Sequence, residues 1–312
     1  MAAQLHLSAA LDDATDDHRP AHAGGASPPP PYARWTRLVR LAEQGGLDFV
    51  TLDGAGGPGG GPGRLDVLAV LARAAGSTSR IGLVPAVAAL PAGRFAPLTS
   101  AAARIAVDGR AGWLVRTALP GDGPFGTQPH VRDAHGAGGP GRRPTARRPL
   151  SGARLRRPHR PPVAVVLDVH GPDRRWLQAA RHADVVLLDA EHPAAAQVCR
   201  AALKHQAAAA GRDPHALRVL LRLGVDLGRG GGRGLRPRAE TLHFAGSPAE
   251  LAGILAEWHA EGVADGFHLL PAHAATDLLA VVYGLVPKLR ERGVFRSGYR
   301  GRTLREHLAP TA

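Results

Sequence analysis

Residues 265–308 read DGFHLLPAHAATDLLAVVYGLVPKLRERGVFRSGYRGRTLREHL, and their pattern is the most informative in the chain. A short apolar segment, Gly266–Leu270, ends at Pro271 and predicts a β-strand. Apolar residues then recur at helical spacing, and basic residues precede Gly293, a glycine of the kind that ends helices. The apolar positions of this predicted helix are Leu278, Leu279, Val282, Leu285, Val286 and Leu289. The stretch therefore predicts one β/α unit.

The same alternation of apolar strand and amphipathic helix recurs upstream. We expect strands at 5–11, 48–52, 80–87, 111–119, 163–167, 184–188 and 217–227. We expect helices at 33–44, 64–75, 98–107, 173–182, 194–210 and 249–261. Strands that are apolar almost throughout are typical of a parallel sheet covered on both faces. Eight such strands favour an α/β fold of the TIM (β/α)8 barrel type, with an open doubly wound sheet as the alternative.

Two glycine- and arginine-rich runs interrupt this rhythm. Residues 120–161 lack a periodic apolar pattern, so we expect a disordered insertion, or one that wraps the surface, within a single barrel domain spanning 1–312. The second run, 228–238, leads to Ser247, which is followed by Pro248 and has Glu250 three residues on. That spacing predicts a helix N-cap at Ser247.

Composition limits the classes of protein to which the chain can belong. Its 312 residues include one cysteine, Cys199, which excludes internal disulfides and cysteine-based metal clusters. The start resembles no signal peptide, and no apolar run has membrane-spanning length, so we expect a cytoplasmic protein without membrane contact. The +13 net charge is almost entirely an arginine excess, and aromatic side chains are scarce. We therefore do not expect nucleic-acid binding, although an acidic partner for the arginine-rich run remains a hypothesis.

Local motifs of several enzyme classes are absent from the sequence. It contains no His-Glu-x-x-His pair, no Gly-x-Ser-x-Gly turn and no Gly-Lys-Ser/Thr after its glycine runs. His18 and His22 have metal-like spacing but lie in a polar stretch, so we expect no metal site. In a TIM barrel the site lies where the strands end. This rule makes the residues at the strand ends candidates, without naming a catalytic residue. They are Leu52, Asp53 and Gly54, residues 88–95, Arg116 and Thr117, Asp168, His170 and Gly171, residues 189–192, Gly246 and Ser247, and residues 271–273.

Three segments in the same order, DGFHLLPA, LVPKLRERGVFRSGY and TLREHL, resemble the ending of luciferase-like flavin-dependent monooxygenases, particularly the nitrilotriacetate-monooxygenase-like branch. The upstream segments WTRLVRLAEQGGLDFVTLD, RIGLVPAV, GRAGWLV, AARHADVVLLDA and FAGSPAELAGILAEW resemble the same family. The resemblance implies a luciferase-like barrel whose fourth helix region is replaced by the Gly/Pro/Arg-rich segment. It also implies an oxidoreductase that uses reduced FMN from a separate flavin reductase, and molecular oxygen, on a small organic substrate; a deazaflavin serves related branches, and a homodimer is expected.

The resemblance also implies which residues face the cofactor, and these positions follow the predicted strands. They are Asp53, His170, Gly171, Gly246 and Ser247. After the third strand the chain reads AALPAGRF, where the family has polar residues. This difference, and the missing fourth helix, leave a second hypothesis open: a catalytically degenerate barrel that serves as a binding or structural partner.

Overall fold

The computed structural model describes residues 4–12, 31–53, 67–88, 109–116, 164–170, 175–228, 234–238 and 241–310. Within these ranges eight parallel strands form a closed ring, because the last of them pairs with both the first and the seventh. The ring runs in the order β1 (His6–Asp12), β2 (Phe49–Asp53), β3 (Gly82–Ala88), β4 (Gly112–Arg116), β5 (Ala164–His170), β6 (Val185–Asp189), β7 (Arg218–Asp226) and β10 (Gly266–Pro271). The TIM-barrel prediction is confirmed, and closure rules out the open sheet.

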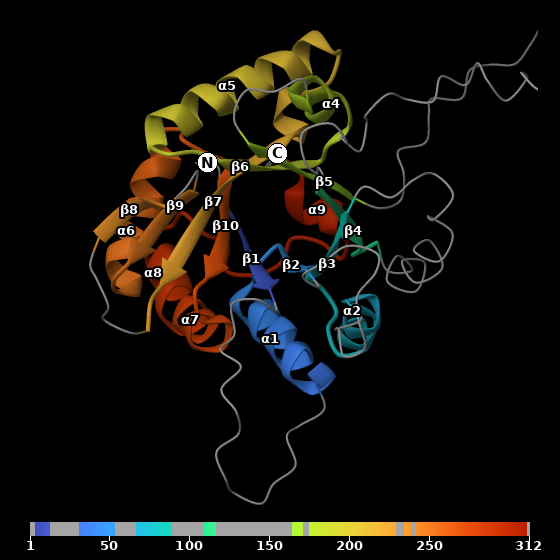
Figure 1. Ribbon diagram of the computed structural model, residues 1–312, viewed down its shortest axis with the longest axis vertical. Coiled ribbons are helices and arrows are strands. Elements are labelled where there is room, and N and C mark those ends of the chain that lie inside the picture. The colour runs from blue at the N-terminus through green and yellow to red at the C-terminus, as the bar shows by residue number, and fades with distance from the viewer. Residues whose placement is uncertain are drawn as a thin grey trace, which may run out of the picture.

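Helices surround the ring of strands (Figure 1). They are α1 (Pro31–Gly45), α2 (Val67–Ala75), α4 (Arg175–His182), α5 (Pro193–Ala209), α6 (Pro248–Ala260), α7 (Ala274–Ala280) and α8 (Val286–Glu291). Their apolar faces pack on the outward side chains of the strands, such as Leu7, Val50 and Leu221, all fully buried. None of the described helices combines the length and apolar character needed to cross a membrane.

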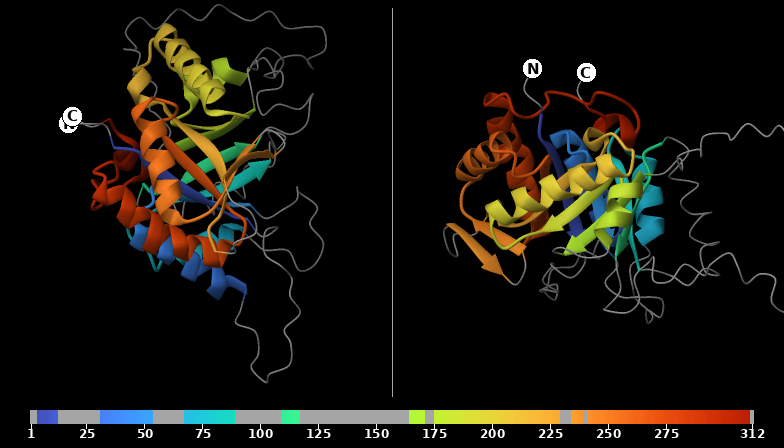
Figure 2. Two further views of the ribbon diagram at one scale, coloured as in Figure 1. Left: turned by 90° about the vertical axis from the view of Figure 1, so that its left-hand side faces the viewer. Right: turned by 90° about the horizontal axis from the view of Figure 1, so that it is seen from above.

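A second apolar cluster fills the inside of the barrel at the end where the strands begin. Inward side chains of the strands meet Leu304 and Leu308 from a short helix, α9 (Leu304–Leu308). The strand residues in this cluster are Phe49, Val84, Leu114, Ala164, Val166, Val185, Leu187 and Leu220. Both chain termini lie at the same end (Figure 2). The C-terminal segment thus plugs this end of the barrel, which leaves the opposite end for a functional site.

The predicted C-terminal helix is present but interrupted. A π-helical turn, η5 (Val281–Leu285), separates α7 from α8, and it lies just before Pro287. Proline has no amide hydrogen to donate, so a wider turn at this point is physically reasonable. Leu279 was expected on the buried face, and this was wrong: it is 47% exposed, while its neighbour Leu278 is fully buried. Gly293 ends the helix with φ 71°, as predicted.

The predicted strands include none between 228 and Ser247, whereas the structure has two. β8 (Gly234–Arg238) and β9 (Thr241–Ala245) form an antiparallel pair, and β9 also extends the sheet beside the second half of β7. Gly224 of β7 permits this contact, because a Cβ there would lie 2.1 Å from the His243 ring. Arginine and glycine give β8 little apolar alternation, so the sequence offered little signal for it. β9 does alternate, with Leu242 and Phe244 as its apolar residues, and sequence reasoning missed it.

Other boundaries differ by a few residues. β5 continues to His170, so Asp168 lies within the strand and not after it. The helix expected at 98–107, the run 120–161 and Gly171 lie outside the described residues, as do the ends of the elements expected at 64–75 and 111–119. The helix predicted after Ser247 is α6, with the expected cap.

Candidate active site at the mouth of the barrel

A buried polar layer lies above the apolar plug, inside the barrel. His268 of β10 is held between Ser8 of β1 and Thr51 of β2, with Nδ1 2.8 Å from the Ser8 hydroxyl and Nε2 3.3 Å from the Thr51 hydroxyl. Its ring stacks on Phe49 with a centroid separation of 5.9 Å. All three polar side chains are at most 3% exposed. Hydroxyl groups can both donate and accept, so they hold the imidazole in one orientation in either neutral tautomer.

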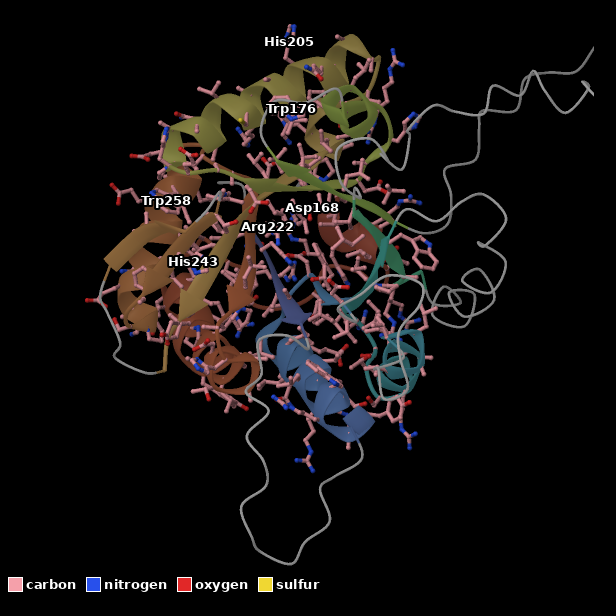
Figure 3. All side chains as sticks on the ribbon, viewed as in Figure 1. Asp168, Trp176, His205, Arg222, His243 and Trp258 are labelled. Atoms are coloured by element: carbon pink, nitrogen blue, oxygen red, sulfur yellow. The ribbon has the colours of Figure 1, made fainter. Side chains whose placement is uncertain are left out.

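A second polar group lies beside the first, because Arg222 of β7 is the register partner of His268 of β10. Arg222 of β7 contacts Asp168 of β5 at 3.1 Å and Asp189 of β6 at 2.9 Å. The Thr241 hydroxyl donates to the other Asp189 oxygen at 2.6 Å. Figure 3 shows Asp168 and Arg222 next to one another within the ring of strands. These charge-assisted hydrogen bonds hold the guanidinium in one orientation. It lies toward the end of the barrel where the strands finish.

Small side chains follow this polar layer toward the strand ends. Ala10 lies two residues beyond Ser8, and Ala86 two residues beyond Val84, so each points to the same inner face as its predecessor. Methyl groups occupy little of the barrel's width. A flat ligand could therefore lie against Thr51, His268 and Arg222, with hydrogen-bonding groups beneath it.

The predicted positions on β2 and β5 lie at this end of the barrel. Asp53 is the last residue of β2, half-buried, and stands two residues beyond Thr51 on the same face. His170 ends β5 and is in register with Asp189. Gly171 lies outside the described residues. The strand-end rule therefore located Asp53, Asp168, His170 and Asp189 at one end of the barrel.

Gly246 and Ser247 serve the start of α6. The Ser247 hydroxyl accepts from the Glu250 backbone N–H at 3.3 Å, and both the Ser247 hydroxyl and its N–H donate to the Glu250 carboxylate at 2.8 Å. The Gly246 N–H donates to the Asp226 carbonyl at 3.2 Å. This capping box satisfies the local donors and places a carboxylate beside them. A phosphate group could contact Ser247 only after Glu250 had moved away.

The opposite end of the barrel is held by ion pairs. Asp48 is fully buried, contacts Arg296 at 2.6 Å and His6 at 3.2 Å, and accepts from the Leu7 N–H at 2.8 Å. Burial alone would raise the pKa of Asp48, but Arg296 and His6 outweigh it and hold that pKa well below its usual range. A cavity of about 370 Å³ opens here, lined in part by His6, Arg218, Arg296, Arg300 and His307. This end of TIM barrels serves stability, so we place the candidate site at the other end.

Comparison with known proteins finds a family that resembles part of the chain. Residues 14–115 match the sequence profile of the luciferase-like monooxygenases. The first part of the chain is thus similar in sequence to the luciferase-like monooxygenase family. The resemblance seen in the sequence is thus confirmed.

The relatives of this luciferase-like chain include nitrilotriacetate monooxygenase component A of Aminobacter aminovorans. It is 41% identical over 63 residues, and the match covers 20% of this chain and 14% of that relative. The chain thus matches only a small part of the curated relative's length. Among solved structures, EDTA monooxygenase (EmoA) from Chelativorans sp. BNC1 has a TM-score of 0.67 at 18% identity, covering 98% of each chain. An F420-dependent secondary alcohol dehydrogenase has a TM-score of 0.59 at 14% identity, covering 92% of this chain and 99% of its own. These structural similarities show a shared fold.

The mouth of this luciferase-like barrel suits the ring of a flavin. Thr51, His268 and Arg222 supply a small set of fixed polar groups beside small apolar residues, the usual composition of a cofactor pocket. The phosphate end is different, because Glu250 occupies the donors at the start of α6. The described residues at the mouth thus fit such a ring, whereas the donors at the start of α6 already have an acceptor.

Sequence reasoning missed Ser8, Arg222 and His268 as parts of the site. Each is a polar residue inside an apolar strand, as in LHLSAAL, LLRLGVD and GFHLLP. A polar side chain at an inward position of a barrel strand costs free energy unless it is hydrogen-bonded. A polar residue within an apolar strand was therefore a visible signal of a site. The sequence does not show which residues form hydrogen bonds with it.

Proposed function

We propose that the chain is a flavin-dependent oxidoreductase of the monooxygenase type, acting on a small organic substrate with reduced FMN and molecular oxygen. The observation that carries this proposal is the buried polar layer of Ser8, Thr51 and His268 next to the fixed Arg222, at the mouth of a barrel whose first part is similar in sequence to this family. One oxygen atom of O2 enters the substrate and the other leaves as water. Reduced FMN supplies the two electrons and two protons that this balance requires.

Within this proposal the chain's own residues bind and orient the cofactor and exclude water from it. Thr51, His268 and Arg222 face the flavin ring, and their neighbours hold them in fixed orientations. Asp53, His170 and Gly171 remain proposed cofactor-facing positions on the strand ends. Gly246 and Ser247 remain proposed as cofactor contacts only for a state in which the Glu250 carboxylate no longer accepts hydrogen bonds from Ser247.

The reductant comes from a separate flavin reductase in this proposal, within a reducing, cytoplasmic setting. The relative from Aminobacter aminovorans is named component A of its monooxygenase, which supports a two-component arrangement. The fold shared with an F420-dependent dehydrogenase supports a deazaflavin as the alternative cofactor. A homodimer is also proposed.

Flavin titration tests the proposal directly. Purified protein is titrated with oxidised FMN, with reduced FMN under anaerobic conditions and with reduced F420, and flavin fluorescence or absorbance is followed. We expect saturable binding of FMN in at least one redox state, weakened on the order of tenfold or more by Thr51→Val, which removes a hydroxyl from the proposed ring site. His205→Gln, an exposed change on the outer side of α5, is the control (Figure 3).

The other outcomes decide between the remaining hypotheses. Binding of F420 alone would replace FMN by a deazaflavin. If no flavin binds in any state, the monooxygenase proposal fails and the catalytically degenerate barrel becomes the working hypothesis. Binding that Thr51→Val leaves unchanged would place the flavin elsewhere.

A further inference from the structure

Three side chains capable of binding metal meet at the rim of the barrel, beside the proposed flavin site but apart from it. Asp226 ends β7, His273 precedes α7 and Asp277 lies in the first turns of α7. One ligand atom from each residue lies within 4.8 Å of the other two. The cluster thus joins a strand, the loop after β10 and a helix.

Asp277 differs from the other buried carboxylates that the structure describes. Each of the others contacts an arginine or a lysine: Asp48 with Arg296, Asp168 and Asp189 with Arg222, Asp184 with Arg305, and Asp265 with Arg200 and Lys204. Asp277 is 0% exposed. Its oxygens accept from the backbone N–H groups of Leu227 at 2.9 Å and His273 at 2.7 Å, and within the described chain no basic side chain pairs with it. A buried charge without a counter-charge is costly.

The neighbours of Asp277 in the cluster, Asp226 and His273, also have polar atoms that lack a partner. Asp226 brings a second carboxylate, and its buried Oδ1 has no hydrogen-bond partner among the described residues. The buried Nδ1 of His273 has none in that part of the structure either. Two carboxylates next to each other repel unless a cation lies between them. Native structures satisfy nearly all buried polar atoms, so two such atoms in one cluster call for a missing partner.

We propose that Asp226, His273 and Asp277 bind a divalent first-row transition metal ion of the Zn²⁺ type. Carboxylate and imidazole ligands lie about 2.0–2.2 Å from Zn²⁺, so ligand atoms around a tetrahedral ion are about 3.4 Å apart. Small side-chain rotations would close the observed cluster to that spacing. The nitrogen ligand favours Zn²⁺ over Mg²⁺ and Ca²⁺, which prefer oxygen ligands alone. The ion would supply the counter-charge that Asp277 lacks and tie the end of β7 to α7.

Zinc titration of the metal-stripped, untagged protein tests this proposal without any flavin. Isothermal titration calorimetry with Zn²⁺ is run on the wild type, on Asp226→Asn, on His273→Gln and on the surface control His205→Gln. We expect one saturable site in the wild type and the control, with affinity lowered on the order of tenfold or more in both site variants. Mg²⁺ and Ca²⁺ are expected to bind more weakly than Zn²⁺. Asp277 is left intact, because its backbone contacts make a folding defect the first effect of its loss.

Circular dichroism on each variant confirms that the fold is retained. Thermal unfolding provides a second readout, since a ligand that binds only the folded state raises its stability. Zn²⁺ should raise the melting temperature of the wild type and of His205→Gln, and do so less for the two site variants. Absence of a saturable site, or unchanged affinity in either site variant, overturns the proposal. Neither result bears on flavin binding, so the two proposals fail separately.

Discussion

Single buried charges in this barrel owe their stability to close partners. Asp265 accepts from Arg200 at 2.7 Å, from Lys204 at 2.8 Å and from the Val219 N–H at 2.8 Å. Burial by itself would raise the pKa of Asp265, but the two cations outweigh it and lower that pKa to about 2. The folded state therefore binds a proton at Asp265 less readily than the unfolded chain does.

Asp265 should make stability depend on pH in the acid range. A carboxylate whose pKa is depressed on folding stabilises the protein above its unfolded pKa of about 4. That contribution, on the order of 2 kcal/mol, is lost as the pH falls toward about 2. Urea unfolding at pH 7, 5, 4 and 3 should show it, together with a similar contribution from Asp48. Asp265→Asn should lower stability at pH 7 and flatten the profile, whereas the exposed change Glu257→Gln should not; equal profiles for the two variants would contradict the assignment.

At the scale of elements, two helices begin with the same device. Ser247 with Glu250 starts α6, and Thr303 with Glu306 starts α9, each as a reciprocal capping box. The sequence indicated the first of these, because the Ser-Pro-x-Glu spacing is local. The π turn before Pro287 and the β8–β9 pair were not anticipated, since both depend on what lies beside them.

The two capping boxes provide a matched pair of variants. Ser247→Ala and Thr303→Ala should each lower the free energy of unfolding by about 1 kcal/mol, because each leaves helix N–H groups without their acceptor. Chemical denaturation measures both. If Ser247 only caps α6, the two variants will bind FMN alike; a weaker FMN affinity confined to Ser247→Ala would show that Ser247 also reaches the cofactor.

At the scale of the whole molecule, the chain end closes the barrel. α9 comes after all eight ring strands, yet Leu304 and Leu308 pack against side chains from β2 to β7 inside the ring. Arg305 of the same helix also contacts Asp184 at 3.0 Å. The plug thus links the end of the sequence to strands far earlier in it, as Figure 2 shows from two sides.

Truncating one side chain of the plug should therefore lower the free energy of unfolding as much as truncating a side chain in the central core does. Leu304→Ala is expected to lower stability by about 2–5 kcal/mol, because Leu304 is fully buried among the inner apolar side chains. Leu279→Ala changes the same residue type at a 47% exposed position and should cost less than about 0.5 kcal/mol. Thermal and urea unfolding of the two variants provide the comparison, and similar losses would show that α9 is not part of the core.

The sequence by itself predicted the eight ring strands, the cap at Ser247 and the strand ends where candidate site residues lie, and it favoured the barrel class over the open sheet. These follow from local periodicity and from residues only a few positions apart. Tertiary structure alone decided that Ser8 meets His268 across 260 residues, that Arg222 lies between Asp168 and Asp189, and that Asp226 meets His273 and Asp277. The physical reason is strand register: periodicity tells which face a side chain occupies, but only the closed sheet fixes which side chains share a level.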